Sequence, residues 1–170
     1  MGEIVGAAVV AHVPPIMLEQ SRRAALNGGR DTTLVDGLAR MKAEVFERLL
    51  PDTVVVVDSH WFTTQDHIIT AHERRSGSFT SEELPSVIHG VRYDAPGDPE
   101  LAAAVARAAA GRDDTWVLAT DDPDLPIRYA TVNLMHHLQG DERWVSPGVC
   151  QTADARDYLL FGQLIGEAIA

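Results

Sequence analysis

The sequence predicts an α/β fold in which helices cover both faces of a mostly parallel or mixed central sheet. Three observations predict it: an apolar run at residues 4–10, a second at 53–57, and an amphipathic stretch at 33–50 between them. Two strands joined through one helix usually form a right-handed crossover, which makes them parallel. With 170 residues, 45% of them hydrophobic, the chain can bury a real core. We therefore expect a single α/β domain over residues 1–170.

The first elements follow from local patterns. Residues 4–10 are almost all apolar and precede two prolines, which predicts a short buried strand. Residues 19–32 are polar and contain two consecutive glycines, so we expect a loop. Residues 33–50 carry apolar side chains at helical spacing, which predicts an amphipathic helix that ends at Pro51.

The middle of the chain predicts two more strands and a long irregular stretch. Residues 53–57 include four consecutive valines, typical of a strand that is buried on both faces. Residues 66–71, DHIITA, are expected to form a third strand. Residues 73–99 are rich in glycine and proline and are expected to be irregular. Loops of that length in a compact domain are usually functional, so this one is a candidate wall of a binding pocket.

The last seventy residues alternate helices with strands. Asp98-Pro99 is a typical helix start, and Asp154 is a typical helix cap. The expected elements are a helix from 99 to about 110, a strand at 115–119, a helix at 126–138, a strand at 143–150 interrupted by Pro147-Gly148, and a final helix running to 170.

Composition excludes some partners. The 14 basic and 25 acidic residues leave a net charge of −11, which disfavours nucleic acid and anionic membrane surfaces. No apolar run approaches the roughly 20 residues of a membrane-spanning helix. Cys150 is the single cysteine, so no internal disulfide can form, which fits a reducing compartment. The N-terminus also lacks the basic start of a signal peptide, and we expect a cytoplasmic protein.

Two histidines follow the first two predicted strands. His12 comes just after residues 4–10, and His60 comes just after the valine run. Carboxyl ends of parallel strands meet at one edge of a sheet, so both imidazoles could reach a single metal ion. The alternative is that each is an ordinary hydrogen-bonded histidine at a strand end. Asp58 lies two residues before His60 and could orient it or simply solvate the strand end. The other five histidines are weaker candidates.

Five stretches resemble the class III extradiol ring-cleavage dioxygenases, in the branch of the homoprotocatechuate 2,3-dioxygenases and 2-aminophenol dioxygenases. They are AAVVAHVPP, VVVVDSHWF, HIITAHERRSGSFTSEELP, VRYDAPGDPELA and IRYATVNLMHHL, and they occur in the family's order. The resemblance implies that His12 and His60 are ligands of a non-haem iron(II). It also implies that Tyr129 reaches the substrate side of the site. The implied substrates are dioxygen and a catechol or 2-aminophenol, and Arg74, Arg75 and Arg92 are candidates to balance a substrate carboxylate.

The chain departs from the family at its C-terminal end. Members of the family continue beyond the position of Ala170, and that part supplies an acid/base histidine and the third metal ligand, a glutamate. The sequence therefore resembles the N-terminal portion of such an enzyme, and alone it could be inactive. We expect further residues or a partner in a homo- or hetero-oligomer to complete the site. Glu82, Glu83 and Asp58 are possible replacements for the glutamate, without support in the sequence.

Two other functions are compatible with parts of the sequence. A non-catalytic subunit or binding protein of the same superfamily would explain the absence of the third ligand and the acid/base histidine. A zinc hydrolase could use the same two histidines, but the sequence has no HExxH pattern and no cysteine–histidine cluster. Retention of both histidines favours the dioxygenase.

Overall fold

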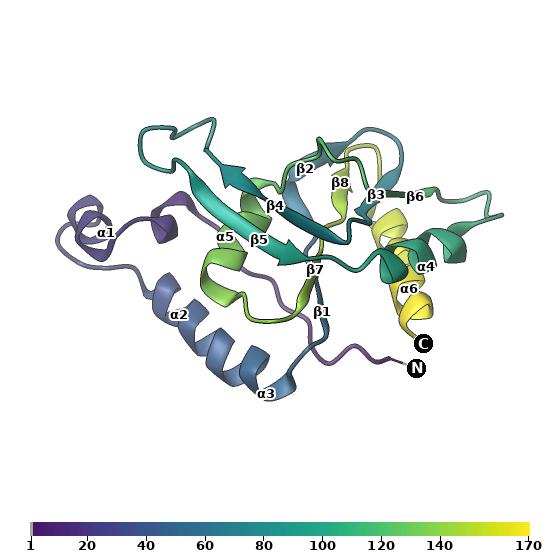
Figure 1. Ribbon diagram of the computed structural model, residues 1–170, viewed down its shortest axis with the longest axis horizontal. Coiled ribbons are helices and arrows are strands. Elements are labelled where there is room, and N and C mark those ends of the chain that lie inside the picture. Colours follow the sequence, from purple (N-terminus) through teal and green to yellow (C-terminus); the bar gives the residue numbers. More distant parts are fainter. Residues whose placement is uncertain (1) are drawn as a thin grey trace.

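The computed structural model describes residues 2–170 and has the α/β architecture that the sequence predicts (Figure 1). The helical elements are η1 (Pro14–Met17), α1 (Gln20–Leu26), α2 (Thr33–Met41), the π-helical η2 (Lys42–Phe46), α3 (Glu47–Leu49), α4 (Pro99–Ala109), α5 (Tyr129–Leu138) and α6 (Ala155–Ile169). The strands are β1 (Thr53–Val55), β2 (Asp58–Thr63), β3 (His67–Thr70), β4 (Arg74–Phe79), β5 (Val91–Pro96), β6 (Val117–Thr120), β7 (Arg143–Val145) and β8 (Gly148–Cys150).

Most strand pairs are parallel, and the sheet structure is mixed. β1 pairs with β7, β2 with β8 and β3 with β6, all in parallel, whereas β4 and β5 form an antiparallel hairpin. The segment that carries β7 and β8 also contacts β3, because the Thr70 amide donates to the Ser146 carbonyl over 3.1 Å. The β7–β8 segment therefore lies between β1 and β2 on one side and β3 on the other.

Two hydrophobic clusters occupy opposite faces of β7. Trp144 packs with α2 and α5 side chains such as Leu38 and Val132, whereas the next residue, Val145, packs with α4 and α6 side chains such as Val105. Consecutive residues of a strand point to opposite faces. Helices therefore cover both faces, as predicted: α2 and α5 lie on one side in Figure 1, and α4 and α6 lie together on the other.

The prediction of a strand at residues 4–10 is wrong. Residues 2–13 have no regular secondary structure, and Ile4 and Val9 are largely exposed. An apolar run indicates burial, but a strand also needs a hydrogen-bonded neighbour, and none of the described strands pairs with this segment. The expected parallel crossover between residues 4–10 and 53–57 is therefore absent as well. The valine run is also less buried than expected: β1 ends at Val55, and Val57, beyond it, is 51% exposed.

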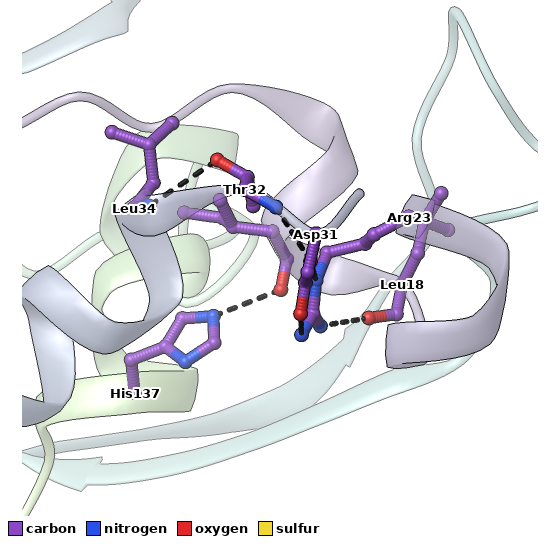
Figure 2. A network of polar contacts seen from close by, with 7 residues as sticks. Leu18, Arg23, Asp31, Thr32, Leu34 and His137 are labelled. Atoms are coloured by element: carbon purple, nitrogen blue, oxygen red, sulfur yellow. Dashed lines mark hydrogen bonds and ion pairs between the residues drawn. The ribbon is translucent and has the colours of Figure 1, made fainter. Parts of the chain in front are cut away.

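Two stretches expected to be irregular contain regular elements. The expected loop at 19–32 includes α1, whose Arg23 pairs with Asp31 at 2.7 Å and donates to the Leu18 carbonyl at 2.6 Å, as Figure 2 shows. The stretch at 73–99 contains the β4–β5 hairpin. β5, VRYDAP, alternates apolar and polar residues, but β4, RRSGSF, has Phe79 as its one apolar side chain and gives no such signal. Gly77 leaves space for the Tyr93 side chain across the pair, because a Cβ at position 77 would lie 2.5 Å from the Tyr93 hydroxyl.

The remaining predicted elements are confirmed. The helix expected at 33–50 is present as α2, η2 and α3, and β3, α4, β6 and α5 lie at or within two to three residues of their expected positions. Pro147 separates β7 from β8, and Asp154 caps α6 through a capping box with Asp157. No helix formed by residues 2–170 is both long enough and apolar enough to cross a membrane.

Candidate metal centre

The structure brings His12 and His60 together from segments 48 residues apart. Their Nε2 atoms are 3.1 Å apart, and the two rings meet edge to face with centroids separated by 5.1 Å. His60 is on β2, whereas His12 lies in the irregular segment that leads into η1. The expected proximity is therefore present, although it does not arise from two parallel strands. His60 is exposed and His12 is half-buried, and both line a cavity that an incoming ion can enter.

Asp58 holds the His60 segment against α5. Its side chain is fully buried, and one carboxylate oxygen accepts the His60 main-chain N–H at 2.8 Å. The other oxygen accepts the Thr131 main-chain N–H at 2.9 Å and the Thr131 hydroxyl at 2.6 Å. Thr131 lies in the first turn of α5, where main-chain N–H groups have no partner within the helix. Asp58 thus binds the backbone of His60, not its ring.

A buried polar chain continues behind Asp58. The Thr131 hydroxyl lies 3.2 Å from the Ser146 hydroxyl, which accepts a hydrogen bond from the Arg75 guanidinium, also over 3.2 Å. All four side chains are buried, and burial lowers the pKa of Arg75 to about 10, so it stays charged at neutral pH. Arg75 and Asp58 are therefore opposite charges at the two ends of one buried network, linked by two hydroxyl groups.

Asn133 holds the His12 segment against the same helix. Its fully buried amide nitrogen donates to the His12 carbonyl at 3.3 Å and to the Tyr129 hydroxyl oxygen at 3.1 Å. The His12 ring has one more protein neighbour, the Ser59 hydroxyl, at 3.4 Å from Nε2. Sequence reasoning missed Asn133, although RYATVN places it four residues after Tyr129, which is on the same face of a helix.

Tyr129 completes the aromatic side of the site. It is the first residue of α5, and its ring centroid lies 4.9 Å from that of His60 and 6.0 Å from that of His12. Burial raises the pKa of the Tyr129 phenol, so it stays protonated at neutral pH. Because its oxygen accepts from Asn133, the phenol proton is available to a group in the cavity.

A cavity of about 290 Å³ opens in front of these groups. It is lined by Val10, Ala11, His12, Val13, Pro14, His60, Glu83 and Tyr129. Glu83 comes from the loop between β4 and β5, so part of the stretch at 73–99 does form a wall of this cavity. No local pattern could have identified Glu83, because only the hairpin carries it to the histidines.

The described residues supply two metal-binding side chains here and no third. Within residues 2–170, no group of three or more His, Cys, Asp or Glu side chains is close enough to hold one ion. Glu83 lines the cavity without completing such a group, and Asp58 is engaged behind His60. Glu82 does not line the cavity.

The arginines expected to balance a substrate carboxylate lie elsewhere. Arg74 and Arg75 line a second cavity, between the β4–β5 hairpin and residues 121–126, and Arg74 is paired with Asp94 at 2.7 Å. Arg92 does not line the histidine cavity. Among the described residues, the histidine cavity has no lysine or arginine in its lining, so the structure lends no support to that expectation.

The other histidines make separate contacts. His67 is buried and stacks on Phe161 with ring centroids 4.5 Å apart. His72 lies 2.7 Å from the Asp122 carbonyl, and His89 lies 3.3 Å from the Thr80 hydroxyl. His137 contacts the Ile16 carbonyl at 3.0 Å and is drawn in Figure 2, and its neighbour His136 is not in the cavity lining.

Comparisons with known proteins identify the family of the chain. Residues 6–142 match the family described as the catalytic LigB subunit of aromatic ring-opening dioxygenase. The chain is also 29% identical to 3,4-dihydroxyphenylacetate 2,3-dioxygenase of Escherichia coli over 172 aligned residues, which are 99% of this chain and 61% of that protein. The chain thus spans about three fifths of the length of this relative. With both histidines and Tyr129 inside the matched region, the chain belongs to the LigB family of aromatic ring-opening dioxygenases.

Proposed function

We propose that this chain carries the iron-binding face of an extradiol dioxygenase that opens catechol or 2-aminophenol rings. The observation that carries the proposal is the pair of imidazole nitrogens 3.1 Å apart at the mouth of a cavity. Imidazole nitrogens lie about 2.1 Å from a divalent ion, so two of them on neighbouring octahedral positions are about 3.0 Å apart. The same distance would also suit a hydrogen bond between the rings, and the experiment below separates the two.

The donor set suits a non-haem iron(II). Two histidines and one carboxylate on one face of an octahedral ion leave positions open for substrate and dioxygen. Bound iron would supply the activation of dioxygen next to a chelated aromatic diol. His12 and His60 would hold it, and their main chains are in turn fixed by Asn133 and Asp58.

Tyr129 has the geometry of a substrate-facing donor. Its protonated phenol faces the cavity beside both histidines and can donate a hydrogen bond to a substrate oxygen. The apolar main-chain and side-chain wall formed by residues 10–14 would lie against the aromatic ring and exclude water. The E. coli relative is named for a catechol that carries an acetate group, which supports a catechol-type substrate.

The third ligand and the acid/base histidine would come from outside the described site. From the resemblance to the family we expect both in a C-terminal part, and the chain covers 61% of the length of the E. coli relative, which supports this expectation. We propose that further residues, or a partner in a homo- or hetero-oligomer, supply them. Without them, two neutral ligands should hold iron(II) weakly, and ring cleavage by this chain alone should be slow or absent.

The test uses the completed enzyme, either a longer form of the chain or its complex with a partner. Iron(II), air and 3,4-dihydroxyphenylacetate or 2-aminophenol are added, and the yellow ring-fission product is followed by absorbance. His12→Ala and His60→Ala should each abolish the product, whereas His136→Ala, a histidine outside the cavity lining, should retain wild-type rates. Wild-type activity in either of the first two variants would exclude these residues as ligands.

The second candidate function is that of a non-catalytic subunit. It is favoured by the absence, among the described residues, of a third metal-binding side chain at the cavity. In that case a complex with a catalytic partner would keep full activity when His12 and His60 of this chain are both replaced by alanine. Loss of activity in that double variant, with the complex intact by size-exclusion chromatography, would exclude the non-catalytic role.

A further inference from the structure

The His12 segment belongs to no strand or helix, so no regular element of its own holds the His12 ring in place. Residues 2–13 form no regular element, yet the His12 ring meets the His60 ring at hydrogen-bonding distance. Two ligands bind one ion more tightly when both are held in place before the ion arrives. Some other contact must therefore set the position of His12 relative to His60.

Helix α5 makes that contact with one face. Tyr129, Asn133 and His137 follow each other at intervals of four residues, so they lie along one side of the helix. Asn133 donates to the His12 carbonyl, and His137 contacts the Ile16 carbonyl (Figure 2). These side chains follow residues 12–16 in the same direction along the helix, so α5 contacts the His12 segment at two successive points.

The N-terminal turn of α5 makes the matching contact with the His60 segment. Asp58 accepts from the His60 main-chain N–H with one oxygen and from the Thr131 main chain and hydroxyl with the other. These are charge-assisted bonds of a fully buried carboxylate, which are stronger than bonds between neutral groups. The His60 main chain therefore cannot move relative to α5 without breaking them.

We propose that Asp58 and Asn133 are positioning residues. They anchor the main chains of His60 and His12 to α5 and so hold the two imidazoles at the distance and orientation that one metal ion needs. The proposal rests on the proposed function, because it assigns these two residues to the same metal site. Neither side chain touches the ion. Each instead fixes the main chain of one ligand residue, and Asn133 also fixes the hydroxyl of Tyr129. Replacing partners that orient metal ligands typically weakens metal binding 10- to 100-fold.

The test measures Co(II) binding to the completed enzyme, either a longer form of the chain or its complex with a partner, by isothermal titration calorimetry. Wild type and all variants are compared in this form, with Co(II) as an air-stable substitute for iron(II). Asp58→Ala and Asn133→Ala should each weaken Co(II) binding by about 10- to 100-fold at a temperature where both variants are folded. Thr131→Val, a near-isosteric change, removes the hydroxyl contacts to Asp58 and Ser146 but keeps the main-chain bond to Asp58, so it should weaken binding by less than Asp58→Ala. It also keeps the proposal testable if Asp58→Ala does not fold.

Matched controls separate positioning from general destabilisation. Asp98→Ala removes another buried carboxylate that caps a helix, α4, and Met135→Ala truncates a buried side chain of α5 that faces a hydrophobic cluster. Both controls should lower the unfolding temperature and leave the Co(II) dissociation constant within about threefold of wild type. If Asp58→Ala and Asn133→Ala behave like these controls, the proposal is wrong.

A measurement without metal distinguishes failure of the proposed function from failure of the positioning role. Imidazole ¹⁵N signals of His12 and His60, recorded by NMR without metal, should shift or broaden in Asp58→Ala and Asn133→Ala and stay unchanged in the controls. If wild type binds no Co(II), or if His60→Ala does not affect binding, the proposed function is wrong. Unchanged imidazole signals in both positioning variants would overturn the positioning role whatever the metal result.

Discussion

Asp98→Ala should destabilise the fold without affecting the histidine site. The Asp98 side chain is buried between α4 and β1 and makes three contacts. It caps α4 by accepting the Leu101 main-chain N–H at 2.9 Å, and it accepts the Thr53 hydroxyl at 2.6 Å. It also lies 3.5 Å from the guanidinium of Arg143, whose side chain is 47% exposed.

The size of the effect follows from these contacts. Loss of a helix cap costs about 1 kcal/mol of unfolding free energy. Loss of a hydrogen bond to a charged acceptor costs about 1.5–3 kcal/mol, and Thr53 is only half buried, so water can replace part of it. The exposed ion pair adds about 0–1 kcal/mol. We therefore expect a loss of about 2–4 kcal/mol, a large part of the 5–15 kcal/mol typical of a domain.

Urea denaturation followed by circular dichroism measures this loss. With a slope of about 2 kcal/mol per molar urea, in the middle of the usual range, the midpoint should fall by about 1–2 M. Asp98→Asn keeps an oxygen that can cap α4, so it should lose roughly half as much. A loss below about 1 kcal/mol for Asp98→Ala, or an equal loss for both variants, would refute the assignment of these contacts as the main source of stability at this position.

Three other predictions concern pH, backbone space and exposed surface. Burial lowers the pKa of His67 in the folded chain, whereas in the unfolded chain it has the ordinary value of about 6.5. When the pH falls below 6.5, the unfolded state therefore takes up a proton at His67 more readily than the folded state. The stabilisation from neutral His67 should therefore be complete above pH 6.5 and decrease as the pH drops below it. In His67→Phe the new ring can keep the stacking on Phe161 but cannot titrate. The loss of unfolding free energy between pH 7.5 and pH 5.5, measured by urea titration, should therefore be smaller in this variant than in wild type. Gly97→Ala should destabilise the fold strongly, because the new Cβ would overlap the His72 carbonyl oxygen. Gly37→Ala lies in α2 with open space around it, so it should increase the unfolding free energy by about 1 kcal/mol and raise the thermal midpoint. A lower thermal midpoint in both variants would contradict this prediction. The isolated chain should self-associate in analytical ultracentrifugation, because large apolar side chains such as Trp116 and Leu159 are exposed; a stable monomer at high concentration would contradict that prediction.

The sequence by itself determined the elements with strong local signals. The helical spacing from Thr33 onward, the start at Asp98-Pro99 and the cap at Asp154 are local interactions between residues close in the chain, so the structure has helices where they were expected. His12, His60 and Tyr129 were also named from the sequence, but mainly through the family resemblance, since the spacing of 48 residues between the histidines is no motif.

Tertiary structure decided what depends on pairing between distant segments. Residues 4–10 have the apolar character of a strand, but hydrogen bonding to a neighbour makes a strand, and the described residues offer them none. The β4–β5 hairpin was missed for the opposite reason: β4 has almost no apolar side chains, yet it forms a strand through its cross-strand pairing with β5. The histidine site depends on the same long-range geometry: α5 contacts the His60 segment through the Thr131–Asp58 bond, across 73 residues, and the His12 segment through Asn133, across 121 residues. Contacts over such separations are set by how the whole chain packs, which no local pattern of residues encodes.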